Sequence, residues 1–190
     1  NGNCLIIDPS DEAERIIDCI EERKAKPLAI LFTHGHFDHI MAAPALVKKY
    51  GIKIYAGEAE RQLLEDSNLN LSRRFLDEDF KLEADEYVKS GDELLFEGLK
   101  LKVLYTPGHT VGSISFYTED LADNEAFKKA AFTGDTLFAG SVGRVDLPTG
   151  SEDTMKRTLN EVIKKLPPDT AVFPGHGAAT TIEREIMHNP

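Results

Sequence analysis

Three histidines and one aspartate lie close together in the segment THGHFDH, residues 33–39. Neutral imidazole and carboxylate groups are ligands that zinc, iron and manganese take in proteins. Alternate side chains that follow a strand point to two sides, so His34 and His36 are expected to bind one ion while Asp38 and His39 face a second. This segment completes neither ligand set, and further ligands must come from other parts of the chain.

Other candidate ligands follow apolar runs of the sequence. His109, Asp135 and His176 lie in short glycine-containing turns at the ends of KVLYTPGHT, AAFTGD and TAVFPGH, as the histidine segment does in LAILFTHGH. Ligands of open α/β sheets bind beyond the carboxyl ends of strands. The pattern therefore predicts that these side chains converge along one edge of the sheets, where an aspartate between two ions can bridge them. His188 lies outside this pattern, and we expect no metal role for it.

The elements that would position these residues alternate between strands and helices, which favours an α/β fold. The apolar runs predict strands at residues 4–7, 28–32, 52–55, within 94–117, at 130–133 and at 171–173. Amphipathic patterns predict helices at residues 13–20, 42–49, 58–66 and 151–166. Residues 67–86 are expected to form a mixed loop and helix, and residues 119–129 a charged surface excursion.

Length and composition fit a single domain over residues 1–190. Hydrophobic residues make up 41% of the chain, and the net charge of −11 disfavours nucleic acid or an anionic membrane as a partner. No apolar run approaches the about 18 residues of a transmembrane helix. With two cysteines and no signal peptide in the sequence, we expect a cytoplasmic protein, although its first residue is Asn and its start can have been trimmed.

The sequence resembles the metallo-β-lactamase superfamily, whose motifs have counterparts along nearly the whole chain. These counterparts are Asp8, the segment 34–39, His109, Asp135 and His176. Within the superfamily, THGHFDH, TPGHTVGS, GDTLFAGSVGR and PGHGAATTIERE resemble short members of the hydroxyacylglutathione hydrolase (glyoxalase II) group. The resemblance implies a four-layer αββα sandwich with a dinuclear metal site at its edge.

The same resemblance implies how the ligands divide between two divalent ions. It places His34, His36 and His109 on one ion, Asp38, His39 and His176 on the other, and Asp135 as the bridge. It also implies that Asp8 supports the site without binding metal. Zinc is the first candidate for both ions, with iron and manganese as alternatives.

The chain departs from the family's pattern at both ends. The strands that usually precede the Asp8–Pro9 segment are expected to be missing or shortened. The helical extension with which glyoxalase II grips glutathione has no counterpart before the chain ends at Pro190. The resemblance therefore supports the catalytic centre better than it supports glutathione as part of the substrate.

These residues and the resemblance together predict a metal-dependent hydrolase that acts on a small-molecule thioester or a related acyl bond. A water molecule shared by two cations loses its proton near neutral pH and attacks the carbonyl carbon, while Asp38 orients it and Asp135 bridges the ions. A thiolate leaves readily, so no strong general acid is needed. Arg144 is predicted to bind a substrate carboxylate, and pairing with Asp146 is its structural alternative.

Rival interpretations remain open at this point. A persulfide dioxygenase-like enzyme with one iron would need a site at the same strand ends. A β-lactamase is less well supported, because no cysteine lies near a predicted ligand and the sequence shows no export signal, and the net charge of −11 disfavours a nuclease. A purely structural zinc site would be closed by four protein ligands, whereas three ligands on each ion and a bridge leave room for water. The sequence leaves open the identity of the metal, the acyl and thiol parts of the substrate, and the oligomeric state.

Overall fold

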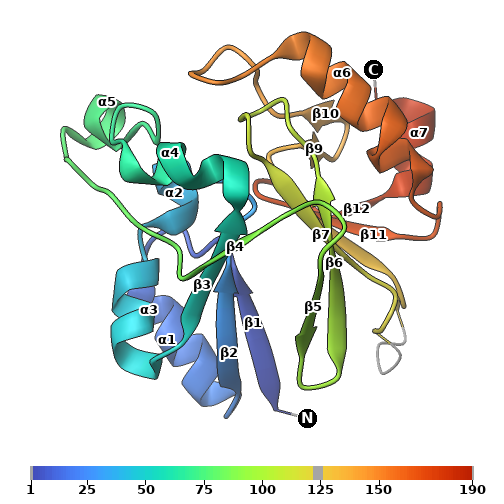
Figure 1. Cartoon of the computed structure of the whole chain (residues 1–190). Coiled ribbons are helices and arrows are strands. Elements are labelled where there is room, and N and C mark those ends of the chain that lie inside the picture. Colours follow the sequence, from blue (N-terminus) through green and yellow to red (C-terminus); the bar gives the residue numbers. More distant parts are fainter. Residues whose placement is uncertain (1, 122–125, 190) are drawn as a thin grey trace. The chain divides into compact units, whose positions relative to one another are not determined.

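The computed structural model describes residues 2–121 and 126–189, so the part of the predicted surface excursion at 122–125 lies outside the described residues. The chain divides into two compact units, Asn1–Val88 and Lys89–Pro190, and the single domain over residues 1–190 stays a prediction. Each unit contains a β-sheet and its own helices, as the α/β prediction requires (Figure 1). No helix within the described ranges is long and apolar enough to cross a membrane.

The first unit contains a four-stranded sheet in the order β1-β2-β3-β4, with all neighbouring strands parallel. Its strands are β1 (Asn3–Ile7), β2 (Lys26–Leu31), β3 (Lys53–Gly57) and β4 (Glu86–Val88). Its helices are α1 (Ala13–Glu22), α2 (Phe37–Ile40), α3 (Ala43–Tyr50), α4 (Arg61–Glu65) and α5 (Ser72–Leu76), with a 3₁₀ turn at Glu58–Glu60. Most of these elements match the predictions. The short helix α2 and the short strand β4 were not predicted, and β4 is defined by its pairing with the distant β3 and not by a local apolar run.

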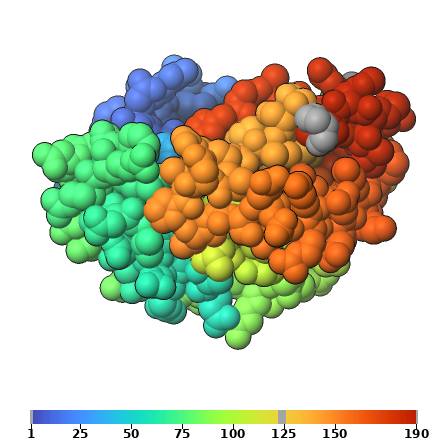
Figure 2. All heavy atoms as spheres, turned by 90° about the horizontal axis from the view of Figure 1, so that it is seen from above, coloured from blue at the N-terminus to red at the C-terminus, as the bar shows by residue number. Residues whose placement is uncertain are grey.

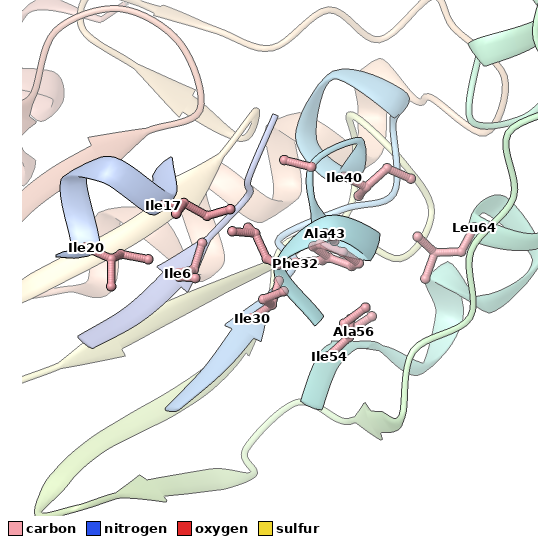
Figure 3. Packing of buried hydrophobic residues seen from close by; sticks show 12 residues of the cluster. Ile6, Ile17, Ile20, Ile30, Phe32, Ile40, Ala43, Ile54, Ala56 and Leu64 are labelled. Carbon is pink, nitrogen blue, oxygen red and sulfur yellow. The ribbon is translucent and has the colours of Figure 1, made fainter. Parts of the chain in front are cut away.

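The core of the first unit lies between the sheet and α1 and α3 (Figure 3). Ile6, Ile30 and Ile54 occupy paired positions on three neighbouring strands, so their side chains form one apolar row. Ile17 and Ile20, three positions apart on α1, pack against this row. The core therefore holds the carboxyl end of β2, from which the histidine segment continues.

The replacement Ile17→Ala tests this packing. Ile17 is 6% exposed and packs in the core, so we expect truncation to lower the free energy of unfolding by about 2–5 kcal/mol. Urea denaturation followed by circular dichroism measures the change. Asp18→Ala, on the exposed side of the same helix, is the control and should change stability by less than about 0.5 kcal/mol. Equal stability of the two variants would contradict the assigned packing of α1.

The second unit contains a six-stranded sheet in the order β12-β11-β8-β7-β6-β5 and a two-stranded hairpin, β9–β10. The strands are β5 (Glu93–Phe96), β6 (Leu99–Tyr105), β7 (Ile114–Thr118), β8 (Ala130–Gly134), β9 (Leu137–Phe138), β10 (Ser141–Val142), β11 (Ala171–Pro174) and β12 (Thr180–Thr181). The helices are α6 (Glu152–Glu161) and α7 (Ile182–His188), with a 3₁₀ turn at Ile163–Lys165. Four elements of this unit were not predicted: β9, β10, β12 and α7. The three strands are only two residues long, too short to show an alternating pattern.

Helix α6 begins as predicted and ends earlier than predicted. The Ser151 hydroxyl accepts a hydrogen bond from the backbone N–H of Thr154 at 3.3 Å, which caps the first turn. The predicted helix over 151–166 is instead divided into α6 and the 3₁₀ turn. Leu166 is extended, as a residue that precedes proline prefers. Figure 2 shows α6, in orange, on the surface of the molecule.

Three strands of the second unit run in the same direction. β6 and β8 are both antiparallel to β7, and β11 is parallel to β8. Their carboxyl ends therefore lie at one edge of the sheet, as the sequence pattern predicts for this unit.

Candidate functional site

Within the second unit, the predicted ligands His109, Asp135 and His176 follow β6, β8 and β11 and lie close together. The Oδ2 atom of Asp135 is 3.6 Å from Nε2 of His109 and 3.7 Å from Nε2 of His176. One carboxylate is thus almost equally distant from two imidazoles that are far apart in the sequence. This placement agrees with the bridging role that the resemblance implies for Asp135.

The ring of His109 is oriented by the backbone of the loop that follows the hairpin. Its Nδ1 atom lies 2.7 Å from the carbonyl oxygen of Arg144. A carbonyl oxygen can only accept, so Nδ1 carries the proton and Nε2 presents its lone pair. Gly143 makes this approach possible, because a Cβ at that position would lie 1.8 Å from the carbonyl oxygen of Asp135. Any larger residue at position 143 would displace the loop.

The first unit carries the other four predicted ligands, which follow the carboxyl end of β2. His34, His36 and His39 are buried, and the ring of His34 has its centroid 4.8 Å from that of His36 and 4.1 Å from that of His39. Asp38 is more exposed, and its Oδ2 atom lies 3.8 Å from Nε2 of His39. The three imidazoles and the carboxylate therefore form one cluster within this unit.

Asp8 holds the histidine segment from the end of the neighbouring strand β1. Its Oδ1 atom accepts a hydrogen bond from the backbone N–H of Thr33 at 2.7 Å. Its Oδ2 atom accepts from the Thr33 hydroxyl at 2.6 Å and lies 3.1 Å from Nδ1 of His39. These contacts leave Nε2 of His39 as the atom that can bind a metal. Asp8 also forms, with His34 and His39, a group that could hold an ion, so its supporting role stays a prediction.

Glu60 is a further residue of this cluster that the sequence analysis missed. Its side chain is fully buried, and Oε2 accepts a hydrogen bond at 2.9 Å from the backbone N–H of Gly35, which separates His34 from His36. The partners are 25 positions apart, and no local pattern around Glu60 indicates the contact. Glu60 therefore helps to fix the turn on which two predicted ligands lie.

Arg144 makes the contact that the sequence analysis named as the alternative to substrate binding. Its Nε and Nη2 atoms donate to the two carboxylate oxygens of Asp146 at 2.7 and 2.8 Å. The hydrogen bond to Asp146 and its negative charge raise the pKa of the Arg144 guanidinium. Both side chains are exposed, so the pair is accessible to an anion that competes with Asp146. The role of Arg144 in substrate binding stays a prediction.

The donor sets of the two units fit divalent metal ions. The separations of 3.6, 3.7 and 3.8 Å between imidazole Nε2 and carboxylate Oδ2 atoms exceed the about 3.2 Å limit of a good hydrogen bond. Two atoms that each bind one tetrahedral ion at about 2.1 Å lie about 3.4 Å apart, close to these values. Imidazole and carboxylate donors of this kind suit zinc, iron and manganese.

The replacement Asp8→Asn tests how the histidine segment is held. Asp8 has a positive φ of 47°, which asparagine tolerates, and the asparagine oxygen can still accept from the N–H of Thr33. The new amide N–H₂ cannot accept from Nδ1 of His39, so we expect zinc affinity to fall by about 10- to 100-fold. Competition with a chromophoric chelator measures the affinity.

Asp11→Asn, at an exposed position of the same loop, is the matched control and should leave zinc affinity unchanged. Circular dichroism would establish that both variants are folded. If folded Asp8→Asn binds zinc as tightly as the wild type does, Asp8 stabilises the loop but does not support metal binding.

Comparisons with known proteins agree with this geometry. Residues 1–176 match the family described as the metallo-β-lactamase superfamily. The chain is 38% identical over 191 residues to "Probable metallo-hydrolase YqgX" of Bacillus subtilis, a match that covers 100% of this chain and 87% of that protein. It is 36% identical over 190 residues to "Hydroxyacylglutathione hydrolase GloC" of Haemophilus influenzae, covering 99% of this chain and 86% of that protein.

Solved structures give the same result. The crystal structure of the BLEG-1 B3 metallo-β-lactamase matches with a TM-score of 0.91 and 37% identity, covering 100% of this chain and 88% of that one. The crystal structure of TTHA1623 in a di-iron-bound form matches with a TM-score of 0.82 and 35% identity, covering 97% of this chain and 87% of that one.

Proposed function

We propose that this chain, which belongs to the metallo-β-lactamase superfamily, cleaves a thioester bond. The chain is a metallo-hydrolase and has the α/β fold of this superfamily, with two sheets flanked by helices. The fold class and the family resemblance predicted from the sequence are confirmed. Relatives of similar identity carry the names of a hydroxyacylglutathione hydrolase and of a β-lactamase, so the choice of substrate needs a chemical argument.

The proposed ligand sets are those implied by the sequence resemblance. The first ion would take His34, His36 and His109, the second would take Asp38, His39 and His176, and Asp135 would bind both. The di-iron form of TTHA1623 supports two ions as the working number and iron as an alternative to zinc. When bound, such ions lower the pKa of water and stabilise the negative charge that develops on a carbonyl oxygen.

The observation that carries the proposal is the position of the Asp135 carboxylate between two imidazoles. Its Oδ2 atom lies 3.6 Å from His109 and 3.7 Å from His176, and the proton on Nδ1 of His109 is held by a backbone carbonyl. A carboxylate held in this way would help to fix cations beside the two imidazoles. Cations held in place in this way would stabilise the negative charge that develops on the carbonyl oxygen during hydrolysis.

The side chain of Asp38 has a different part in the proposed reaction. Its carboxylate is 41% exposed and that of Asp135 is 11% exposed, so Asp38 is the more accessible of the two carboxylates in the proposed ligand sets. It can accept a hydrogen bond from the attacking water molecule and so orient the water's lone pair toward the carbonyl carbon. Because a thiolate is a good leaving group, this arrangement needs no acid to protonate it, which favours a thioester over an amide.

Metal removal tests the reaction class. We expect protein treated with a chelator to lose at least about 100-fold of its S-lactoylglutathione hydrolysis and to regain it with zinc, iron or manganese. Metal analysis of protein purified without added metal should give two ions per chain. The same preparations are assayed with other acyl thioesters, with a β-lactam, and for persulfide-dependent oxygen uptake.

Each outcome of this panel decides between the candidates. Metal-dependent cleavage of a thioester supports the proposal. Full activity in metal-free protein would contradict the mechanism. Cleavage of the β-lactam alone would contradict the thioester as substrate. One iron per chain with oxygen uptake would indicate a persulfide dioxygenase-like enzyme and not a hydrolase.

Arg144→Ala tests whether the exposed guanidinium binds the substrate. For a thioester that carries a carboxylate, we expect KM to rise about 10-fold with little change in kcat, because a charge-assisted hydrogen bond is lost. An uncharged thioester should show no change. Arg157→Ala, an exposed arginine on α6, is the control. If KM for the anionic thioester is unaltered in Arg144→Ala, the pairing with Asp146 is the arginine's whole role.

A further inference from the structure

The β9–β10 hairpin, Leu137–Val142, connects two parts of the proposed metal site. It begins directly after Asp135 and Thr136, and it ends before Gly143 and Arg144, whose carbonyl oxygen orients His109. Gly143 lies so close to the backbone of Asp135 that the two ends of the hairpin are in contact. A displacement of the hairpin would therefore move Asp135 and the hydrogen-bond partner of His109 together.

Helix α7 holds the tip of this hairpin through Glu185. The Oε2 atom of Glu185 accepts a hydrogen bond from the backbone N–H of Gly140 at 2.8 Å, and Oε1 accepts from the Thr180 hydroxyl at 2.5 Å. Gly140 has a φ of +78°, a conformation that favours glycine and forms the tight turn between the two strands. The carboxylate thus holds the backbone of this turn.

Asn189 holds the sides of the same hairpin. Its Nδ2 atom lies 2.9 Å from the carbonyl oxygen of Ser141, 3.4 Å from that of Phe138 and 2.8 Å from Oε2 of Glu185. One amide therefore contacts both strands of the hairpin and the carboxylate that holds its tip. We call Glu185 and Asn189 the α7 clamp.

The charge of Glu185 strengthens these contacts. The side chain is 4% exposed, and burial raises its pKa, but the hydrogen bonds from Thr180, Gly140 and Asn189 outweigh burial and hold the pKa below its ordinary value. The carboxylate is therefore ionised at neutral pH. Its contribution to stability is present above the unfolded-state pKa of about 4.3 and is lost as pH falls through the lower folded-state value.

We propose that Glu185 and Asn189 are positioning residues of the metal site, which hold the hairpin so that Asp135 and the carbonyl group that orients His109 stay in place. The inference rests on the proposed function, since it takes Asp135 and His109 as metal ligands. It assigns a role to α7, an element that contributes no predicted ligand. The last element of the described chain then acts on chemistry that occurs beside the hairpin.

Glu185→Ala and Glu185→Gln test the clamp. The alanine variant loses every hydrogen bond to the carboxylate, so we expect faster amide hydrogen exchange over residues 137–144 and zinc affinity about 10- to 100-fold lower. The glutamine variant keeps an oxygen for Gly140 and an N–H₂ group that can donate to Thr180. It should remain within about 3-fold of the wild-type zinc affinity. Asn189→Ala should give a smaller effect in the same direction.

Two controls separate positioning from general stability. Glu183→Ala lies on the exposed side of α7 and should change neither measurement. Ile17→Ala lowers stability in the first unit, which does not include the hairpin, so its folded fraction should protect residues 137–144 from exchange normally. The proposal is overturned if folded Glu185→Ala retains wild-type zinc affinity and exchange, or if its profile equals that of Ile17→Ala.

The kinetic readout separates this proposal from the proposed function. With the thioester that the wild-type enzyme cleaves, Glu185→Ala should lower kcat, and Glu185→Gln should restore it, while KM changes by less than about 3-fold. If the wild-type protein cleaves no thioester, the proposed substrate fails, and the zinc and exchange measurements still decide on the clamp. If Glu185→Ala shows faster amide hydrogen exchange over residues 137–144 but cleaves the thioester as the wild type does, the clamp holds the hairpin without positioning the metal site. The proposal then fails.

Discussion

The direction of each imidazole lone pair depends on what binds the opposite nitrogen of the ring. In the first unit the carboxylate of Asp8 contacts Nδ1 of His39, and in the second unit the carbonyl oxygen of Arg144 contacts Nδ1 of His109. These contacts fix both the tautomer and the rotation of the ring before any metal arrives. An ion that binds such a ring does not have to order it, so less of its binding free energy is spent on conformational entropy.

These oriented rings require neighbouring backbone to come very close, and the sequence provides for this at particular positions. Gly143 lies against the carbonyl oxygen of Asp135, and Gly35 lies between two histidines against Leu63 and Leu64. The buried carboxylate of Glu60 accepts a hydrogen bond from the backbone N–H of Gly35, and that of Glu185 accepts one from the N–H of Gly140 at the tip of the β9–β10 hairpin. In both units a carboxylate that is not a predicted ligand therefore holds backbone close in sequence to the predicted ligands.

The strands, and the turns that carry the predicted ligands, could be predicted because they depend on residues that are close together in the sequence. Apolar runs that end in glycine-containing turns with His or Asp predicted the ligand positions. The Glu185–Gly140 contact spans 45 positions and the His39–Asp8 contact spans 31. The α7 clamp had no local signal, and the supporting role of Asp8 came only from the family resemblance. The strands of the hairpin are two residues long, too short for an alternating pattern to identify.

His109 depends on the main-chain carbonyl group of Arg144 and not on its side chain, so the side chain is left for the proposed contact with substrate. Every amino acid carries a carbonyl group, so the guanidinium can be exchanged for another group while the imidazole keeps its anchor. The backbone carbonyl group of residue 144 is therefore required to orient His109, whereas its side chain can be replaced. A scaffold of this kind can acquire a new preference among substrates without rebuilding the centre that performs the chemistry.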